Sequence, residues 1–216
     1  MNPTLIVFDL DGTLIDSRRD LADSANALLE ACAAEPLSEE RIGRMVGDGA
    51  ATLVARVFEA RGLPMPADAL ARFLAFYDER LLQHTRPYNG IPSLLDLLAL
   101  RAELALLTNK PLASTRRILA GLDLARHFRD AAVVGGDGPL PRKPDPAALR
   151  ALVARAGARP DQTLLVGDSV IDFRTARAAL TPVCLARYGF GFDGFPVHEL
   201  GPDDFVIDSP GELLTM

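Results

Sequence analysis

The stretch TLIVFDLDGT, residues 4–13, decides the fold. Residues 4–8 form a short, largely apolar run rich in β-branched side chains, which is typical of a strand buried on both faces of a parallel sheet. Asp9 and Asp11 follow directly and point to the same side, where two carboxylates repel each other unless a cation or a proton lies between them. A solvated turn capped by aspartate is the alternative. The buried strand before the turn favours a metal-bound carboxylate pair.

Five further apolar runs resemble this first strand, and helical patterns separate most of them. Alternation of strand and helix predicts right-handed βαβ units and therefore an α/β fold with a doubly wound, Rossmann-like parallel sheet. The runs cover residues 104–108, 131–134, 163–166, 183–186 and 205–207.

Residues 17–83 interrupt the alternation, because their pattern is mostly helical. Apolar residues recur at helical spacing in two stretches, which predicts two amphipathic helices. We interpret the segment as a helical cap, residues 17–83, inserted into a core made of residues 1–16 and 84–216. The two faces are Leu21, Ala25, Leu28, Leu29 and Cys32, and Leu70, Phe73, Leu74, Tyr77 and Leu81.

Composition excludes several classes of protein. The 216 residues carry a net charge of −6 and a sequence pI near 5.1, which argues against a nucleic-acid-binding protein. No apolar stretch is long enough to cross a membrane, and the start lacks the basic region of a signal peptide. Two distant cysteines favour a reducing compartment. We expect a soluble, cytoplasmic monomer or homodimer.

Polar side chains also follow two later strands or lie in the loops after them. Thr108 and Asn109 lie between a predicted strand and a predicted helix, where they could donate to phosphate oxygens or simply cap the helix. The chain has only two lysines, Lys110 and Lys143, beside 21 arginines. A tight site that bridges a carboxylate and a phosphoryl oxygen suits a compact ammonium better than a guanidinium fork. A chance position on a solvated loop is the alternative, and for Lys110 the two interpretations are evenly balanced.

A last acidic pair follows the run 163–166. Asp168 lies at the predicted strand end, and Asp172 faces the same side if a helix begins at once. Hard carboxylate oxygens of this kind suit Mg²⁺. Because ligands of open α/β sheets bind beyond the carboxyl ends of the strands, we expect these residues to lie near Asp9 and Asp11.

Together these groups resemble the four motifs of the haloacid dehalogenase superfamily, over the whole chain. The helical insertion is similar to the first type of cap in that superfamily. The residues that carry the resemblance are Asp9, Asp11 and Thr13, then Thr108, then Lys143, then Gly167, Asp168, Ser169 and Asp172.

The resemblance implies a mechanism. Asp9 is then the nucleophile that forms an aspartyl-phosphate, and Asp11 is the general acid and base. The resemblance also places Mg²⁺ on Asp9, the Asp11 carbonyl and Asp168, with Asp172 orienting bound water. The implied phosphate-binding residues are Thr13, Thr108, Asn109 and Lys143, and Lys143 also counts as catalytic.

Within the superfamily, the residues favour the phosphatases. Asp11 argues against the metal-free dehalogenases, and the absence of lysine between residues 17 and 83 argues against phosphonate cleavage by a Schiff base. The segment IGRMVGDGA, residues 42–50, is similar to the specificity loop of phosphoglycolate phosphatases. Its candidate specificity residues are Arg44, Gly47, Asp48 and Gly49, although a plain helix–helix turn and, for Arg44, a solvated face remain alternatives.

The expected activity is therefore Mg²⁺-dependent hydrolysis of a small phosphorylated metabolite, 2-phosphoglycolate in the first place. The alternatives are a phosphosugar mutase, a phosphatase of sugar phosphates, nucleotides or pyrophosphate, and a non-catalytic binding module.

Two segments depart from familiar patterns. The helix after Asp172 ends in the stretch AALT, residues 178–181, where relatives commonly have a glycine. The segment GFGFDG, residues 189–194, matches a dinucleotide-binding pattern, but Pro196 follows and no helix opens there, so we expect only a mobile loop near the site.

Overall fold

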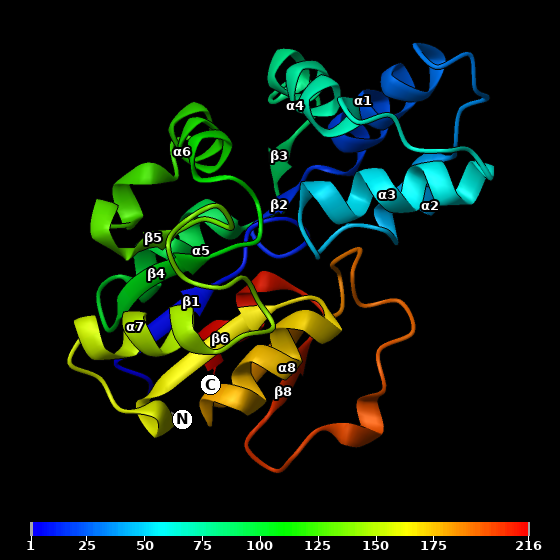
Figure 1. Ribbon diagram of the computed structural model, residues 1–216. Helices are drawn as coiled ribbons and strands as arrows, with labels where there is room; N and C mark the ends of the chain where they lie inside the picture. Colours follow the sequence, from blue (N-terminus) through cyan, green and yellow to red (C-terminus); the bar gives the residue numbers. More distant parts are fainter. Residues whose placement is uncertain (1, 216) are drawn as a thin grey trace.

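The structure is a computed structural model that describes residues 2–215 (Figure 1). Six parallel strands form one sheet in the order β5-β4-β1-β6-β7-β8. The first strand of the chain therefore lies near the middle of the sheet, between the strands that carry the second and fourth polar groups. The strands are β1 (Leu5–Phe8), β4 (Glu103–Leu107), β5 (Val133–Val134), β6 (Thr163–Gly167), β7 (Val183–Ala186) and β8 (Phe205–Ile207).

The predicted α/β fold and its six strands are confirmed. β5 is shorter than expected, because the 3₁₀ turn Asp130–Ala132 takes the first half of the predicted run. The antiparallel pair β2 (Ile15–Asp16) and β3 (Arg86–Pro87) was not predicted. Each of its strands has two residues, which is too short to show any periodicity in the sequence.

Side chains of β1 alternate between two hydrophobic clusters, one on each face of the sheet. Ile6 and Phe8 belong to the cluster that includes α5 (Ile91–Leu98) and α6 (Leu112–Gly121). On the opposite face, Leu5 and Val7 pack with α7 (Ala147–Arg155) and α8 (Val170–Ala179). Burial on both faces of the sheet explains why all four residues of β1 are apolar. The remaining short helices are Ala125–His127, Pro160–Gln162, Val197–Glu199 and Pro210–Thr215.

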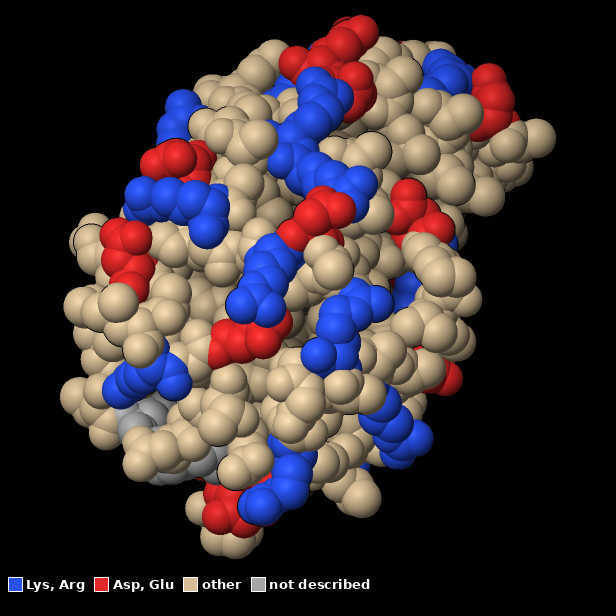
Figure 2. All heavy atoms as spheres, turned by 90° about the vertical axis from the view of Figure 1, so that its left-hand side faces the viewer, with Lys and Arg blue, Asp and Glu red and all other residues tan. Residues whose placement is uncertain are grey.

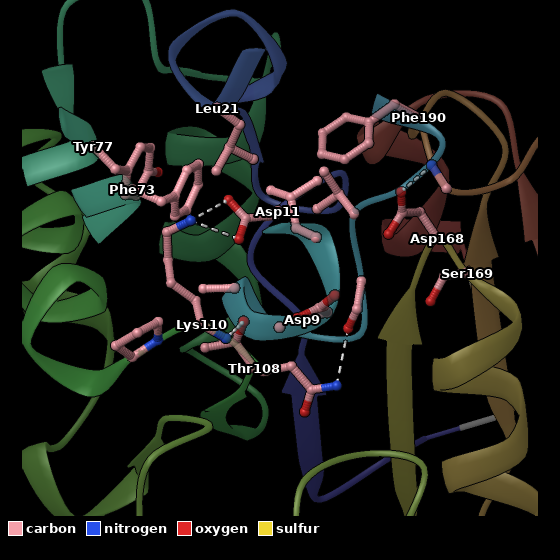
Figure 3. A pocket seen from close by; sticks show the side chains of 18 of the residues that line it. Asp9, Asp11, Leu21, Phe73, Tyr77, Thr108, Lys110, Asp168, Ser169 and Phe190 are labelled. Carbon is pink, nitrogen blue, oxygen red and sulfur yellow. Dashed lines mark hydrogen bonds and ion pairs between the residues drawn. The ribbon is translucent and has the colours of Figure 1, made fainter. Parts of the chain in front are cut away.

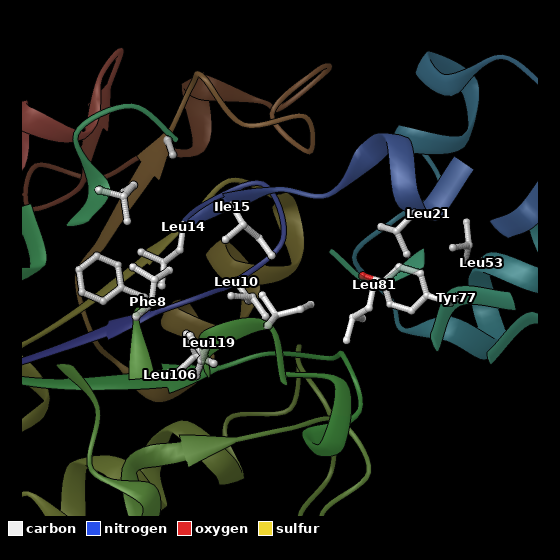
Figure 4. Packing of buried hydrophobic residues seen from close by; sticks show 14 of the residues in the cluster. Phe8, Leu10, Leu14, Ile15, Leu21, Leu53, Tyr77, Leu81, Leu106 and Leu119 are labelled. Carbon is white, nitrogen blue, oxygen red and sulfur yellow. The ribbon is translucent and has the colours of Figure 1, made fainter. Parts of the chain in front are cut away.

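Four helices form a separate layer beyond the sheet (Figure 1). Apolar residues of the first loop continue the core into this layer: Leu10, Leu14 and Ile15 belong to the same cluster as residues of the helices (Figure 4). None of the helices in residues 2–215 is long and apolar enough to cross a membrane. The four helices are α1 (Arg18–Glu30), α2 (Glu39–Gly43), α3 (Ala50–Arg61) and α4 (Ala69–Arg80).

A buried carboxylate ties together the two connections between sheet and helical layer. Asp20, fully buried in α1, accepts hydrogen bonds from the backbone N–H of His84 at 2.9 Å and of Thr85 at 2.8 Å, and from the Thr85 hydroxyl at 2.7 Å. The pair β2–β3 lies next to this contact. The division into a cap of residues 17–83 and a core of residues 1–16 and 84–216 stays a prediction. The hydrogen bonds of Asp20 connect the two chain segments at which this cap would begin and end.

Ion pairs hold the helical layer against the sheet half of the molecule. Arg117 of α6 pairs with Asp78 of α4. On the face shown in Figure 2, Lys and Arg side chains are interspersed with Asp and Glu side chains.

Leu180 is strained, and its replacement by glycine is expected to stabilise the protein. The residue ends α8 with φ of 62°, a left-handed conformation that costs a leucine free energy and a glycine almost none. Its side chain is 78% exposed, so little burial is lost. We expect Leu180→Gly to raise the free energy of unfolding by about 0.5–1 kcal/mol, measured by urea denaturation.

Leu100→Gly is the matched control, because Leu100 is equally exposed after α5 but does not have positive φ. There glycine only adds freedom to the unfolded chain, so the same assay should show a loss of stability. A stability loss in both variants would contradict the strain at Leu180.

Candidate active site

Asp9 and Asp168 follow neighbouring strands at their carboxyl ends. β1 pairs with β6 so that Phe8 lies opposite Val166, and the Asp9 N–H donates to the Val166 carbonyl at 2.8 Å. Asp172 lies in the first turn of α8, which begins soon after β6. One oxygen from each of the three carboxylates lies within 4.8 Å of the other two, and all three residues are buried. The expected meeting of acidic residues from opposite ends of the chain is thus present (Figure 3).

Asp172 is fixed from several sides. Its Oδ2 accepts hydrogen bonds from the Ser169 hydroxyl at 2.6 Å and the Ser169 N–H at 3.1 Å, which closes a capping box at the start of α8. Its other oxygen accepts a hydrogen bond from the Lys143 ammonium at 2.7 Å. A Cβ at Gly167 would lie only 2.2 Å from the Asp172 carboxyl carbon, so the strand passes directly beneath the carboxylate.

Lys143 joins two members of the carboxylate cluster. Its ammonium lies 2.7 Å from an Asp172 oxygen and 2.8 Å from Asp9 Oδ1, and its side chain is 2% exposed. Burial alone would lower the pKa of Lys143, but the carboxylates of Asp172 and Asp9 raise it above the ordinary lysine value. The residue is therefore a buried, permanently charged cation beside Asp9.

Burial raises the pKa of Asp9 to about 6, with Lys143 opposing the shift and Asp172 adding to it. Burial raises the pKa of Asp168 well above its ordinary value, and the carboxylates of Asp172 and Asp9 add to that shift. In both cases the charged form lacks sufficient counter-charge in the protein alone. A cation at this cluster would supply it.

Asp11 points away from this cluster. Its two oxygens lie 3.0 and 2.8 Å from the Lys110 ammonium, and one of them accepts a hydrogen bond from the Ser17 hydroxyl at 2.5 Å. The Lys110 side chain is 4% exposed, and its ammonium lies 4.6 Å from the centre of the Tyr77 ring. Asp11 thus lines the cavity with its carboxylate paired to Lys110, and its role as general acid and base stays a prediction.

The carboxylate cluster fits a divalent cation in two respects. Asp9 Oδ1 is buried and accepts no hydrogen bond from residues 2–215, although the Lys143 ammonium lies near it. The four carboxylates of Asp9, Asp11, Asp168 and Asp172 face two lysines, which leaves a formal charge of −2. A single divalent cation neutralises that charge, and all donors are the hard oxygens that Mg²⁺ prefers.

The predicted phosphate-binding residues lie at the same end of the sheet. The Thr13 hydroxyl donates to Asp168 Oδ1 at 3.3 Å, while Thr108 and Asn109 line the cavity. The Asn109 amide donates to the carbonyl of Gly47 in the helical layer at 2.9 Å and to the carbonyl of Lys143 at 3.0 Å. Asn109 therefore connects the helical layer to the loop that carries Lys143, a role that its sequence position did not reveal.

The four predicted specificity residues divide into two pairs. Gly47 and Gly49 line the cavity with φ of 121° and 89°, so both use backbone conformations that favour glycine. Asp48 pairs with Arg56 at 2.6 Å. Arg44 pairs with Glu40 and lies 3.1 Å from Asp193, and neither Arg44 nor Asp48 lines the cavity. Their roles in specificity stay predictions.

The segment of residues 189–194 is more than a loop near the site. The Gly191 N–H donates to Asp168 Oδ2 at 2.7 Å, and Phe190 lines the cavity (Figure 3). A Cβ at Gly189 would lie 2.3 Å from the Gly12 carbonyl oxygen and 2.3 Å from the Asp168 Cβ. The signal that could have revealed this contact is the position of both glycines just after the fifth predicted strand, at the same sheet edge as the acidic groups.

Gly189→Ala is expected to lower kcat/KM for a phosphoester by about 10²-fold, because the new methyl group displaces the loop that holds Asp168. Phosphate release from a small phosphoester measures the effect. Gly211→Ala is the control, since a Cβ at Gly211 meets nothing within 4 Å. Equal activity of the two variants would contradict the role of the close approach.

A partly open cavity lies between sheet and helical layer, with a free volume of about 50 Å³. Its floor is polar and includes Asp9, Asp11 and Asp168, whereas its roof is apolar and comes from α1, α3, α4 and the loop before α3. By the usual criterion of about 10–15 Å³ for one water-sized group, the cavity holds only a few such groups. The apolar roof consists of Leu21, Val46, Leu53, Phe73, Leu74 and Tyr77.

The chain is similar to known hydrolases over most of its length. The haloacid dehalogenase-like hydrolase family matches residues 6–186. A phosphoglycolate phosphatase of Rhodospirillum rubrum is 45% identical over 94% of this chain and 88% of its own, and phosphoglycolate phosphatase 1 of Pseudomonas aeruginosa is 36% identical over 98% and 79%.

Among solved structures, a predicted phosphoglycolate phosphatase from Haemophilus somnus superimposes with a TM-score of 0.90 at 30% identity, covering 100% of this chain and 98% of the other. The matched region contains all four polar groups and the helical layer. The chain therefore belongs to the haloacid dehalogenase-like hydrolase family.

Proposed function

We propose that this protein is a Mg²⁺-dependent phosphatase that hydrolyses 2-phosphoglycolate through a phosphoryl intermediate on Asp9. The observation that carries the proposal is the cluster of Asp9, Asp168 and Asp172 with Lys143, in which Asp9 and Asp168 line one cavity together with a further carboxylate, Asp11. A nucleophile, a cation site and a proton donor are then within one small volume.

The chemistry takes two steps. A carboxylate oxygen of Asp9 attacks phosphorus while the bond from phosphorus to the ester oxygen breaks, and Asp11, which enters this step in its protonated form, gives a proton to the departing oxygen. Asp11 then removes a proton from water, which attacks the phosphorus of the acyl phosphate and releases phosphate and free Asp9. Asp11 regains in the second step the proton that it lost in the first.

The remaining residues hold and orient the phosphoryl group. Lys143 neutralises Asp9 and would contact a phosphoryl oxygen, and we assign Thr13, Thr108 and Asn109 to the same phosphate site. Asp9, Asp168, Asp172 and the Asp11 carbonyl would hold Mg²⁺. The ion, when bound, offsets the negative charge of the nucleophile and the transferring group.

Two observations support 2-phosphoglycolate as the substrate. The relatives named above are phosphoglycolate phosphatases and cover most of this chain. The free cavity of about 50 Å³ has room for a two-carbon leaving group. We further propose a cytoplasmic location, supported by the unpaired Cys32 and Cys184, and a monomer or homodimer.

A substrate panel tests the proposal. We expect free phosphate to appear fastest from 2-phosphoglycolate, compared with sugar phosphates, nucleotides and pyrophosphate, in the presence of Mg²⁺. Analysis of the sugar phosphates after incubation separates hydrolysis from isomerisation. An isomerised sugar phosphate without phosphate release would instead indicate a mutase.

A further inference from the structure

The cavity offers one cation to the leaving group of a substrate. Among the described residues that line it, Lys110 alone carries a positive charge. Lys143 lies below the cavity among the carboxylates, and Arg44 lies outside the lining with two acidic partners. A substrate with a second anionic group would therefore meet Lys110 first.

Lys110 is positioned to bind a ligand while it stays paired with Asp11. Its ammonium has three N–H groups, and the oxygens of Asp11 account for two of them at 3.0 and 2.8 Å. The side chain is 4% exposed, and the face of the Tyr77 ring lies 4.6 Å away. The Tyr77 hydroxyl is the other polar group near this ammonium, and no further oxygen of residues 2–215 accepts a hydrogen bond from it, so the two groups together retain capacity for a ligand (Figure 3).

Tyr77 supplies a second, independent observation. The residue lines the cavity and is 3% exposed, and its hydroxyl has no hydrogen-bond partner among the described residues. A buried hydroxyl without a partner is costly unless a ligand completes it. Its ring stacks on Phe73 at 6.0 Å, which fixes the direction of the hydroxyl.

The covalent structure of a two-carbon phosphoester brings its carboxylate to this place. The carboxyl carbon of 2-phosphoglycolate is two bonds from the ester oxygen, which is the atom that Asp11 protonates in the proposed reaction. A carboxylate so close to Asp11 would be repelled unless both shared a cation, and an apolar roof strengthens every such charge interaction. Lys110 touches Asp11 and is the cation that both carboxylates could share.

We infer that Lys110 and Tyr77 form the subsite that binds the carboxylate of the substrate, with the ammonium shared between that carboxylate and Asp11 and the hydroxyl donating to its outer oxygen. This inference rests on the proposed function and deepens it. It selects a carboxylate attached directly to the ester-bearing carbon, and it assigns to Lys110 the role that the sequence left undecided.

The test compares kcat/KM for 2-phosphoglycolate with kcat/KM for ethyl phosphate, in which a methyl group replaces the carboxylate and the ester oxygen is unchanged. Lys110→Gln should lower the ratio of the two values about 10- to 100-fold, as expected for loss of a charged hydrogen bond. Tyr77→Phe should lower it about 3- to 10-fold. The tyrosine variant keeps the stacked ring, so it tests the subsite even where the lysine variant fails to fold.

Arg44→Gln tests the competing role in specificity that the sequence predicts for Arg44. Arg159→Gln is the matched control, because it removes an exposed cation that lies outside the cavity lining. The ratio should be unchanged. A ratio that falls in Arg44→Gln but survives in Tyr77→Phe and Lys110→Gln would overturn the subsite and assign the carboxylate to Arg44. Equal loss of both activities in Lys110→Gln, with an unchanged ratio in Tyr77→Phe, would overturn it too, since Lys110 would then serve Asp11 alone.

The wild-type ratio separates this inference from the proposed function. A ratio near one in the wild-type protein would overturn 2-phosphoglycolate as substrate, and with it the subsite. A high wild-type ratio that persists in both subsite variants would leave the proposed function standing and overturn the subsite alone.

Discussion

Asp9→Asn is expected to lower turnover of any phosphoester by at least about 10⁴-fold, as for loss of an enzymatic nucleophile. An amide oxygen is a far weaker nucleophile than a carboxylate, and no described carboxylate takes its place: Asp11 is paired with Lys110, and Asp172 is fully buried beneath Lys143. Phosphate release under Mg²⁺ saturation measures the loss.

The loss should not come from unfolding. Burial raises the pKa of Asp9 to about 6, so its charged form is disfavoured in the folded protein and a neutral amide removes a penalty rather than a support. Lys143 keeps its hydrogen bond to Asp172. The melting temperature of Asp9→Asn should therefore equal or exceed that of the wild-type protein.

Asp161→Asn is the matched control, because it makes the same chemical change at an exposed position paired with Arg159. It should retain full activity. Appreciable turnover by Asp9→Asn would refute the assignment of the nucleophile, whereas an equal loss in both variants would point to a general effect of the substitution.

The fold and the acidic cluster could be predicted from sequence because their signals are local. Each strand is a continuous apolar run, and the polar groups come directly after β1, β4 and β6 or in the loop before α7. Parallel strands bring their carboxyl ends to one edge of the sheet, so the order of the groups in the chain suffices to place them together. The rarity of lysine then indicated that Lys143 belongs to the same site.

Contacts that depend on side-chain direction could not be predicted. Nothing local shows that the Asn109 amide reaches Gly47 in the helical layer, or that Asp11 turns toward Lys110 and away from the metal cluster. Asp20 lies in the first turn of α1, yet it accepts a hydrogen bond from the backbone of His84, 64 residues later. Such contacts arise from the packing of separate elements, which the periodicity of one segment does not encode.

Removal of divalent metal with EDTA is expected to abolish turnover, and excess Mg²⁺ should restore it. Four carboxylates meet two lysines at this site, and a phosphoester adds further negative charge. Without a cation, an anionic nucleophile approaches an anionic substrate in a buried environment where repulsion is weakly screened. Undiminished rates in excess EDTA would contradict the metal site.

The same charge imbalance predicts how stability depends on metal and pH. Asp9 and Asp168 have raised pKa values in the folded protein because of burial. Their contribution to stability is therefore fully present below the unfolded pKa and is lost as pH rises through the folded pKa. For Asp9 this loss occurs between the ordinary pKa of 3.8 and about 6, and for Asp168 it extends to higher pH. Metal-free protein should thus be less stable at pH 8 than at pH 6.

Mg²⁺ should reverse this loss, since it binds the folded cluster and not the unfolded chain. At 100 times its dissociation constant it would add about 2.7 kcal/mol, or roughly 5–10 °C in melting temperature for a chain of this length.

Without Mg²⁺, Asp168→Asn at pH 8 should melt higher than the wild-type protein, because it removes one buried charge while its amide can still accept from the Gly191 N–H. Its melting temperature should no longer respond to Mg²⁺, whereas Asp161→Asn should respond fully. If Asp168→Asn kept the full Mg²⁺ response, the cation would have to bind outside this cluster. Asp168 is the carboxylate of the cluster that has no lysine partner, so it is the one that most needs the ion.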